Sequence, residues 1–253
     1  MEGDPSDLVR RFREDGFVAV PGFFDAATLE AVLDRIALIK TGRRNGLPPE
    51  RFFYETKDAP ETLKQVQELF RWDGFFHDLM LDGAAIRLAR ALLQDEAVAK
   101  NMQYFNKPPA ASTPTPPHQD GFYFMLDPCE AVTMWVALEP VDAENGCVRY
   151  LKGSHGAGLQ PHSRTDVLGF SQAVDGFDRL RDDFEEVAFP ATPGTLLAHH
   201  ALTVHWADAN RSPRRTRQAL GFIYYAGRAK EDAERHAAYQ RRLAEEMARA
   251  GRI

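Results

Sequence analysis

The sequence has few cysteines, no long apolar run and no excess of positive charge. Two cysteines among 253 residues, Cys129 and Cys147, are too few for a disulfide framework. No apolar run reaches the roughly 18 residues that a membrane span needs. Lysine and arginine number 31 against 37 acidic residues, and the net charge of −6 argues against nucleic acid as the main partner, because phosphate binding needs a basic surface. We expect a globular protein without a nucleic-acid or membrane partner.

The amino-terminal residues, Met1 to Pro5, are acidic and lack the basic and apolar regions of a signal peptide. Together with the low cysteine content, this predicts a reducing, cytoplasmic location. The chain contains no internal repeat, and 253 residues are within the range of one large domain. We therefore expect a single domain over residues 1–253.

The first part of the chain, up to about residue 97, has mainly helical periodicity. Leu29, Val32 and Ile36 recur at helical spacing after Asp25, which suits the N-cap of that helix. Further helices are predicted at about 6–15, 60–71, 74–82 and 85–94, and short strands at 17–20 and around 52–54.

Residues 98–226 have a different character, because short runs rich in aromatic and β-branched residues recur between glycine, proline and aspartate. Strands and helices do not alternate here as they do in a parallel fold. We therefore expect a mainly β protein with flanking helices, its core a double-stranded β-helix of the jelly-roll, cupin-like type. The predicted strands lie at about 99–106, 115–126, 130–138, 147–151, 185–189, 194–205 and 217–225.

Two further segments lie outside these strands. Residues 157–184 have little strand signal, and loops of this length are usually functional, so Gly158 to Asp183 is predicted to be a mobile lid over the site. Beyond Gly227, apolar residues at helical spacing predict an amphipathic helix at about 228–249, packed on the barrel or on a second subunit. The protein is expected to be a monomer or a homodimer.

The segment His118-Gln119-Asp120 combines an imidazole and a carboxylate two positions apart. On a strand, such side chains point to the same side, because successive side chains alternate between the faces. His205, far along the chain, is the natural third ligand. Two imidazoles and one carboxylate are the ligand set of non-haem Fe(II) oxygenases. Taken alone, the triplet is a weak signal, because most such triplets are surface residues on a strand.

Two other histidines compete with His205 for the role of third ligand. His199 and His200 are adjacent, so at most one of them faces inward on a strand. Either could instead be a hydrogen-bonded histidine that lines the barrel. His155 and His162 are predicted in loops, where they are either unassigned or substrate-facing.

Arg217 opens an apolar strand, and two interpretations of it are open. It is either a surface residue at the mouth of the strand or a partner for a dicarboxylate, because guanidinium binds carboxylate in a bidentate manner and keeps its charge. Arg214 and Arg215 precede the apolar run and are expected in solvent.

From about Gln103 to Tyr225 the chain carries an ordered series of short motifs. They are Asn106-Lys107-Pro108-Pro109, His118-Gln119-Asp120, Met134-Trp135-Val136-Ala137-Leu138, Glu144-Asn145-Gly146-Cys147, Gly153-Ser154-His155, His205 with Asn210, and Arg217-Gln218-Ala219-Leu220. In this order they resemble the phytanoyl-CoA dioxygenase family of Fe(II)- and 2-oxoglutarate-dependent oxygenases.

The resemblance implies a metal site and a cosubstrate site. It implies His118, Asp120 and His205 as iron ligands, Arg217 as the clamp on the distal carboxylate of 2-oxoglutarate, and Gln103, Gln119, Trp135 and Lys64 as cosubstrate contacts, with Lys64 offset by one position. This chain has Ala207 where members often have serine, and one extra residue between His205 and Arg217. The extra residue leaves Arg215 as an alternative clamp.

The implied activity uses Fe(II), 2-oxoglutarate and dioxygen to hydroxylate an unactivated C–H bond of a small molecule, with release of succinate and carbon dioxide. Desaturation or cyclisation by the same machinery is an alternative. Asp120 disfavours halogenation, because its carboxylate fills the position that a halide needs. The complete triad and Arg217 disfavour a non-catalytic jelly-roll binding module. The sequence does not identify the substrate.

Overall fold

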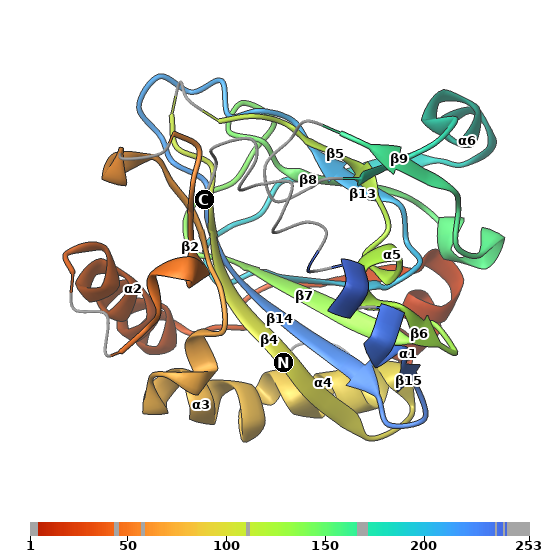
Figure 1. Cartoon of the computed structure of the whole chain (residues 1–253), viewed down its shortest axis with the longest axis horizontal. Helices are drawn as coiled ribbons and strands as arrows, with labels where there is room; N and C mark the ends of the chain where they lie inside the picture. The colour runs from red at the N-terminus through yellow and green to blue at the C-terminus, as the bar shows by residue number, and fades with distance from the viewer. Residues whose placement is uncertain are drawn as a thin grey trace.

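Two antiparallel sheets face each other across the centre of the protein (Figure 1). The computed structural model describes residues 5–42, 46–56, 59–109, 112–165, 172–235, 237–239 and 241. In the seven-stranded sheet the strand order is β1-β12-β7-β14-β4-β3-β2, and in the four-stranded sheet it is β11-β8-β13-β5. This arrangement confirms the predicted jelly roll with flanking helices.

The large sheet takes strands from both halves of the chain. Its members are β1 (Phe17–Val20), β2 (Phe52–Tyr54), β3 (Leu63–Val66), β4 (Ala97–Asn106), β7 (Ala131–Ala137), β12 (Leu196–His200) and β14 (Gln218–Ala226). The small sheet consists of β5 (Thr115–His118), β8 (Val148–Leu151), β11 (Glu186–Phe189) and β13 (His205–Ala207). Two-stranded sheets join β6 (Leu126–Asp127) to β15 (Lys230–Glu231) and β9 (His162–Arg164) to β10 (Gln172–Val174).

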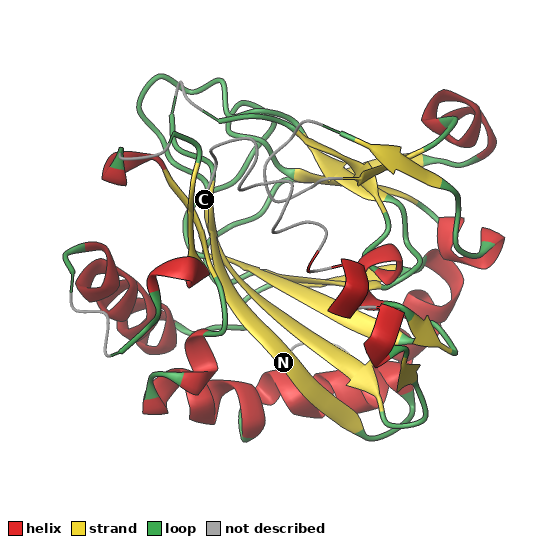
Figure 2. Ribbon diagram, in the orientation of Figure 1, coloured by secondary structure: helices red, strands yellow, loops and turns green. Residues whose placement is uncertain are grey.

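Helices lie along the outer face of the large sheet (Figure 2). They are α1 (Pro5–Asp15), α2 (Ala26–Lys40), α3 (Gly74–Leu81) and α4 (Ala84–Leu93). Short 3-10 turns occur elsewhere in the chain, at Pro49–Arg51, Pro60–Thr62, Leu69–Arg71 and Ser154–Ala157. Asp25 caps α2 as predicted, its carboxylate accepting from Thr28 N at 2.8 Å.

Alternation along the central strands separates two apolar cores. Met134 and Phe222 point outward and pack with the helices, whereas Trp135 and Ala219 point inward, toward Tyr150 of the small sheet. All seven residues of β7 are buried, because both of its faces are covered. The inward faces of β4, β7, β12 and β14 thus form the floor of the interior.

The prediction of a helix over residues 60–71 is wrong. Leu63–Val66 form strand β3, in which all four residues are buried. Their Cα partners lie on β2 and β4, for example Gln65 opposite Phe105. Leu, Lys and Gln are good helix formers, but pairing between two neighbouring strands overrides that weak preference.

Two long predicted strands are each divided by a turn. In residues 115–126, β5 ends at His118 and a short helix, α5 (Gly121–Phe124), follows. In residues 194–205, β12 ends at His200 and β13 begins at His205 in the opposite sheet. Both turns carry the chain between elements on different sides of the interior, which a run of strand-forming residues does not reveal.

The two segments outside the core differ in part from the prediction. Residues 157–184, with little strand signal, contain the hairpin of β9 and β10 and then α6 (Phe177–Asp183), while 166–171 lie outside the described residues. The carboxy-terminal helix does not begin at 228, because β15 pairs with β6. Residues 233–235 and 237–239 are helical, and most of the predicted remainder lies outside the described part.

Candidate metal centre

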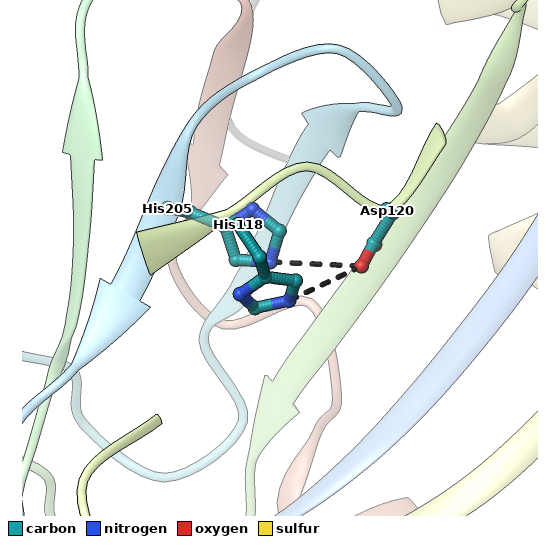
Figure 3. A group of neighbouring side chains, drawn as sticks. All are labelled: His118, Asp120 and His205. Atoms are coloured by element: carbon teal, nitrogen blue, oxygen red, sulfur yellow. Dashed lines mark ion pairs between the residues drawn. The ribbon is translucent and has the colours of Figure 1, made fainter. Parts of the chain in front are cut away.

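Three side chains converge inside the barrel (Figure 3). His118 ends β5 and His205 begins β13, and the two are directly paired in the small sheet with ring centroids 4.2 Å apart. Asp120 lies just after β5, and its Oδ1 is 3.4 Å from His118 Nε2 and 3.8 Å from His205 Nε2. The candidate ligand atoms all lie within 4.8 Å of one another.

Asp120 reaches this position through a turn and not through strand alternation. Its backbone is helical, with φ −59° and ψ −33°, at the start of α5. The turn directs its carboxylate toward the large sheet while His118 stays on the small one. The prediction that both residues lie on one strand is therefore wrong, although the predicted proximity of their side chains is found.

The backbone orients both imidazoles. His118 Nδ1 lies 2.8 Å from Pro116 O, and His205 Nδ1 lies 3.0 Å from Thr203 O. Since a carbonyl only accepts, each Nδ1 carries the proton and each Nε2 lone pair is directed toward Asp120. Burial, followed by the neighbouring His199 and His118, lowers the pKa of His205 well below its ordinary value, which keeps it in the neutral form that binds metal.

The donor set fits a metal ion. Two lone pairs and a carboxylate oxygen are directed at one buried point, which a cation stabilises. Burial alone would raise the pKa of Asp120, but His205, His118 and His199 together hold it well below its ordinary value, so the carboxylate is charged. Atoms that bind one ion at about 2.1 Å lie within roughly 4.2 Å of each other, as the two measured distances do. Two histidines and one carboxylate match the facial triad of non-haem iron.

A buried arginine lies on the same interior floor. Arg217 is only 5% exposed, and its Cζ lies 5.3 Å from the ring centroid of Trp135. Its Nε is buried and has no hydrogen-bond partner among the described residues. Burial lowers the pKa of Arg217 to about 10, against the opposing effect of Cys147 and Glu139, so the side chain remains charged at neutral pH. A buried, incompletely paired guanidinium is a site for an anionic ligand.

Arg215 lies at the surface instead. Its guanidinium binds Asp142 at 2.9 Å and also pairs with Glu144, two acidic residues that are themselves partly exposed. Of the two arginines that the sequence offers, only Arg217 enters the interior.

Two lysines accompany Arg217, and one of them was missed by the sequence analysis. Lys64 lies 3.3 Å from Glu55, and Lys107 donates to Thr113 O at 2.7 Å. Lys107 and Arg217 exchange both backbone hydrogen bonds, at 3.0 and 3.1 Å. Burial, and then Arg217 and Lys64, lower the pKa of Lys107 well below its ordinary value. The sequence signal that could have identified Lys107 as a site residue was its position in the Asn106 to Pro109 motif.

Gln103 and Trp135 lie on either side of Gly221. Gly221 is the Cα partner of Gln103 on β4 and of Trp135 on β7. A Cβ on Gly221 would lie 2.7 Å from the ring of Phe105, so a larger residue would displace that ring. Gln103 Oε1 accepts from Gln65 Nε2 at 2.5 Å. Trp135 and Thr133 are two positions apart and therefore on the same face of β7, and Thr133 donates to Asp120. Trp135 and its neighbour Gln103 thus lie between Arg217 and the triad.

Gln119 has a different environment, because its amide binds loop backbone. Nε2 donates to Gly158 O at 2.9 Å and to Leu202 O at 2.6 Å, while Oε1 accepts from Gln160 N at 2.7 Å. These bonds connect the metal-binding segment to the start of the 157–184 segment and to the turn before His205. A cosubstrate contact by Gln119 stays a prediction.

Replacement of Gln119 by methionine is expected to lower the free energy of unfolding by about 3 kcal/mol, because Leu202 O and Gln160 N lose their partner and Gly158 O keeps only the bond from Gln160 Nε2. This corresponds to a fall in Tm of roughly 6 to 12 °C in a protein of this size. Gln94→Met, on the exposed end of α4, is the matched control and should melt as the unmodified protein does. Equal melting of both variants would show that these bonds contribute no stability.

The other histidines have separate roles. His199 is the one of the adjacent pair that faces inward, with Nε2 3.2 Å from Asp120 Oδ2. His200 faces the opposite way, toward Phe12 and His155. His162 accepts from the backbone N–H of Gln119 at 3.1 Å, and its ring stacks on Phe122 with centroids 4.4 Å apart.

Comparison with known proteins agrees with this geometry. Residues 12–219 match the phytanoyl-CoA dioxygenase (PhyH) family. Bovine (Bos taurus) phytanoyl-CoA dioxygenase domain-containing protein 1 is 28% identical in an alignment of 260 positions, which covers 86% of this chain and 88% of that protein. The epimerase SnoN, solved with Fe3+, alpha ketoglutarate and nogalamycin RO, has a TM-score of 0.71 and 25% identity over 90% of this chain and 85% of its own. The carbocyclase SnoK from nogalamycin biosynthesis has a TM-score of 0.69 and 25% identity over 89% and 85%.

The His-Asp-His group of this chain fits an iron site, and the similar structure of SnoN was solved with Fe3+ and alpha ketoglutarate. The match over residues 12–219 includes every motif up to Arg217. The chain belongs to the phytanoyl-CoA dioxygenase family of Fe(II)- and 2-oxoglutarate-dependent oxygenases.

Proposed function

We propose that the protein hydroxylates an unactivated C–H bond of a small molecule, with release of succinate and carbon dioxide. One observation carries the proposal: the interior has a facial triad at one place and, along the same floor, a buried guanidinium whose Nε is unpaired among the described residues. That combination suits a cosubstrate that chelates iron at one end and has a free carboxylate at the other.

Each residue has a stated task in this reaction. His118, Asp120 and His205 hold iron, which with 2-oxoglutarate and dioxygen supplies the oxidising power. Arg217 pairs with the distal carboxylate of 2-oxoglutarate, and this carboxylate neutralises the buried positive charge. Trp135 supports the guanidinium through its ring face, at 5.3 Å.

Three more residues belong to the proposed cosubstrate site. Gln103 lies between Arg217 and the triad and can donate to the cosubstrate through its amide nitrogen. Lys64 adds positive charge beside Arg217, and Lys107 adds a buried amine there, whose pKa burial and the neighbouring cations lower. With Glu55 as the carboxylate bound to Lys64, the group retains an excess of positive charge, which favours a dianionic ligand over a neutral one.

The segment after the small-sheet strand β8 is proposed as a lid that excludes water from the site. α6 packs on the small sheet through Phe177, whose ring lies 4.9 Å from that of Trp206. The hairpin is joined to α5 beside the metal ligands, because Tyr123 OH both donates to Gln172 O and accepts from Gln172 N, each at 3.2 Å. Closing such a segment strengthens electrostatic interactions inside the site.

Hydrogen exchange tests the lid. Protection of residues 158–165 and 172–183 is expected to rise when 2-oxoglutarate and substrate bind without oxygen, because the open form is then depopulated. The outer helix α2 serves as the internal control and should exchange equally in both states. Unchanged exchange across the lid residues would contradict this assignment.

A second reaction outcome is favoured by a specific observation, because two similar solved structures are named as an epimerase and a carbocyclase. The same hydrogen abstraction can end in ring closure, desaturation or inversion. A screen of small molecules by succinate release, followed by product mass, separates the outcomes. One added oxygen atom supports hydroxylation, loss of two hydrogen atoms indicates cyclisation or desaturation, and an unchanged mass with one inverted stereocentre indicates epimerisation.

Location and assembly stay predictions. No helix in the described part of the chain is long and apolar enough to cross a membrane. Cys129 and Cys147 are unpaired, which is consistent with the predicted reducing cytoplasm. Either a monomer or a homodimer is compatible with the described residues.

A further inference from the structure

We infer that His199 is a positioning residue for the metal centre: together with Thr133 it holds Oδ2 of Asp120, so that the carboxylate binds the metal through Oδ1 alone. The inference rests on the proposed triad and adds two residues and one binding mode to it.

The two oxygens of Asp120 have different surroundings. Oδ2 accepts a hydrogen bond from Thr133 Oγ1 at 2.5 Å and lies 3.2 Å from His199 Nε2. Oδ1 instead faces His118 and His205 at 3.4 and 3.8 Å. Thr133 and His199, the two donors to Oδ2, come from the large sheet. The two candidate ligands His118 and His205 come from the small sheet. The carboxylate therefore connects the two sheets, with one oxygen assigned to each.

The charged carboxylate of Asp120 determines which nitrogen of His199 carries a proton. Because a carboxylate only accepts, His199 Nε2 is protonated and donates to Oδ2. The Tyr150 hydroxyl lies 3.1 Å from His199 Nδ1, and both side chains are buried. Tyr150 thus gives the second ring nitrogen a partner and orients the ring.

Packing holds His199 at this angle. Its ring centroid is 4.1 Å from that of His205, and Phe17 of β1 is its Cα partner in the large sheet. It is 3% exposed, and both ring nitrogens have partners. A histidine placed only to fill the core would not need a donor directed at a metal-binding carboxylate.

One-oxygen binding has a chemical consequence. A carboxylate that binds through both oxygens occupies two coordination positions, and the facial triad works by leaving positions open. Holding Oδ2 in two hydrogen bonds keeps a position available for the cosubstrate. It also orients Oδ1 before metal arrives, and partners of this kind typically contribute 10- to 100-fold in metal affinity.

Anaerobic titration with Co(II), a stable replacement for Fe(II) with visible absorption, tests the inference on the full chain. His199→Phe keeps a planar ring but has no donor, and it is expected to weaken Co(II) binding about 10- to 100-fold. His199→Gln restores an N–H donor with a different shape and should recover most of the affinity. The matched control is His77→Phe on the exposed face of α3, which should bind as the unmodified protein does.

Two further variants keep the test decisive if His199→Phe does not fold. Thr133→Val removes the other donor to Oδ2 at nearly constant volume and is expected to weaken Co(II) binding by a similar factor. Tyr150→Phe removes only the hydroxyl and should have a smaller effect, because His199 can still donate. Unchanged affinity in both His199→Phe and Thr133→Val would overturn the inference, as would equal losses in His199→Phe and His199→Gln, which would indicate ring shape alone.

Failure of the site itself is distinguishable. If Asp120→Ala binds Co(II) as tightly as the unmodified protein, the metal is not at the triad and the proposed function fails. If Asp120→Ala loses the metal but the variants of His199 and Thr133 do not, only the positioning role is wrong.

Discussion

Asp120→Ala is expected to abolish turnover and to weaken Fe(II) binding by more than about a hundredfold, since removal of a ligand should cost more than removal of a partner of a ligand. The variant leaves His118 and His205 directed at the same point without the charge that balances the cation. Asp120→Asn keeps the shape and the bond from Thr133 but not the charge, and it should also lose activity. Iron binding and succinate release, measured on the same preparations, check both effects.

Asp34→Ala, on the exposed face of α2, is the control and should match the unmodified protein in both measurements. Asp120 lies 3.2 Å from His199, so its loss also frees a buried donor, and melting curves must show that the variant is folded. Normal iron affinity in folded Asp120→Ala would place the metal elsewhere. Normal iron affinity with no succinate release from the unmodified protein, for any substrate, would favour a binding module.

The sequence predicted the three side chains of the candidate metal centre, but the reason given by strand alternation does not hold. Asp120 is not on a strand, and its carboxylate reaches the site because the chain turns into α5. The ordered motifs identified the three residues because they depend on residue types and their order along the chain, and not on whether each residue lies on a strand or in a turn. The pairing of His118 with His205 depends on the register of two strands far apart in the chain, which no local pattern encodes.

The fold class followed from the sequence because it depends on properties summed over many residues. Apolar alternation and turn residues predicted most strands of the core. The exception, β3, is made of helix-forming residues and exists only because β2 and β4 pair with it on either side. Because these residues were predicted as a helix, the direction of the Lys64 side chain toward Arg217 was not predicted either.

Two residues of the site were not predictable, for a common physical reason. Lys107 and His199 each act through a partner distant in sequence, Arg217 in one case and Asp120 in the other. In sequence, a lysine before two prolines and one of two adjacent histidines are ambiguous. Only the tertiary structure shows that Lys107 is buried among cations and that His199 faces the triad.

Arg217→Ala is expected to raise the KM for 2-oxoglutarate by roughly two to three powers of ten. A carboxylate left without its partner in a buried site loses about 3–5 kcal/mol, and each 1.4 kcal/mol is about tenfold. Arg217→Lys restores the charge but not the bidentate hydrogen bonding of a guanidinium, so it should recover only part of the loss. Iron affinity should survive in both variants, because Arg217 is not a ligand of the metal.

The stability of these variants separates binding from folding. Burial lowers the pKa of Arg217 to about 10, so the charged side chain destabilises the folded protein when no anion is bound. Arg217→Met, which keeps much of the apolar stem, should therefore melt no lower than the unmodified protein without cosubstrate. Addition of 2-oxoglutarate to the metal-loaded protein should raise the Tm of the unmodified protein further and leave that of the metal-loaded variant nearly unchanged.

Arg215→Ala is the internal control for the clamp. Its guanidinium is paired with Asp142 and Glu144 at the surface, where ion pairs contribute little, so KM and Tm should hardly change. A large rise in KM for Arg215→Ala together with a normal KM for Arg217→Ala would assign the clamp to Arg215. It would also mean that the loop between His205 and Arg217 rearranges when 2-oxoglutarate binds, because Arg215 would have to leave two carboxylates to reach the interior.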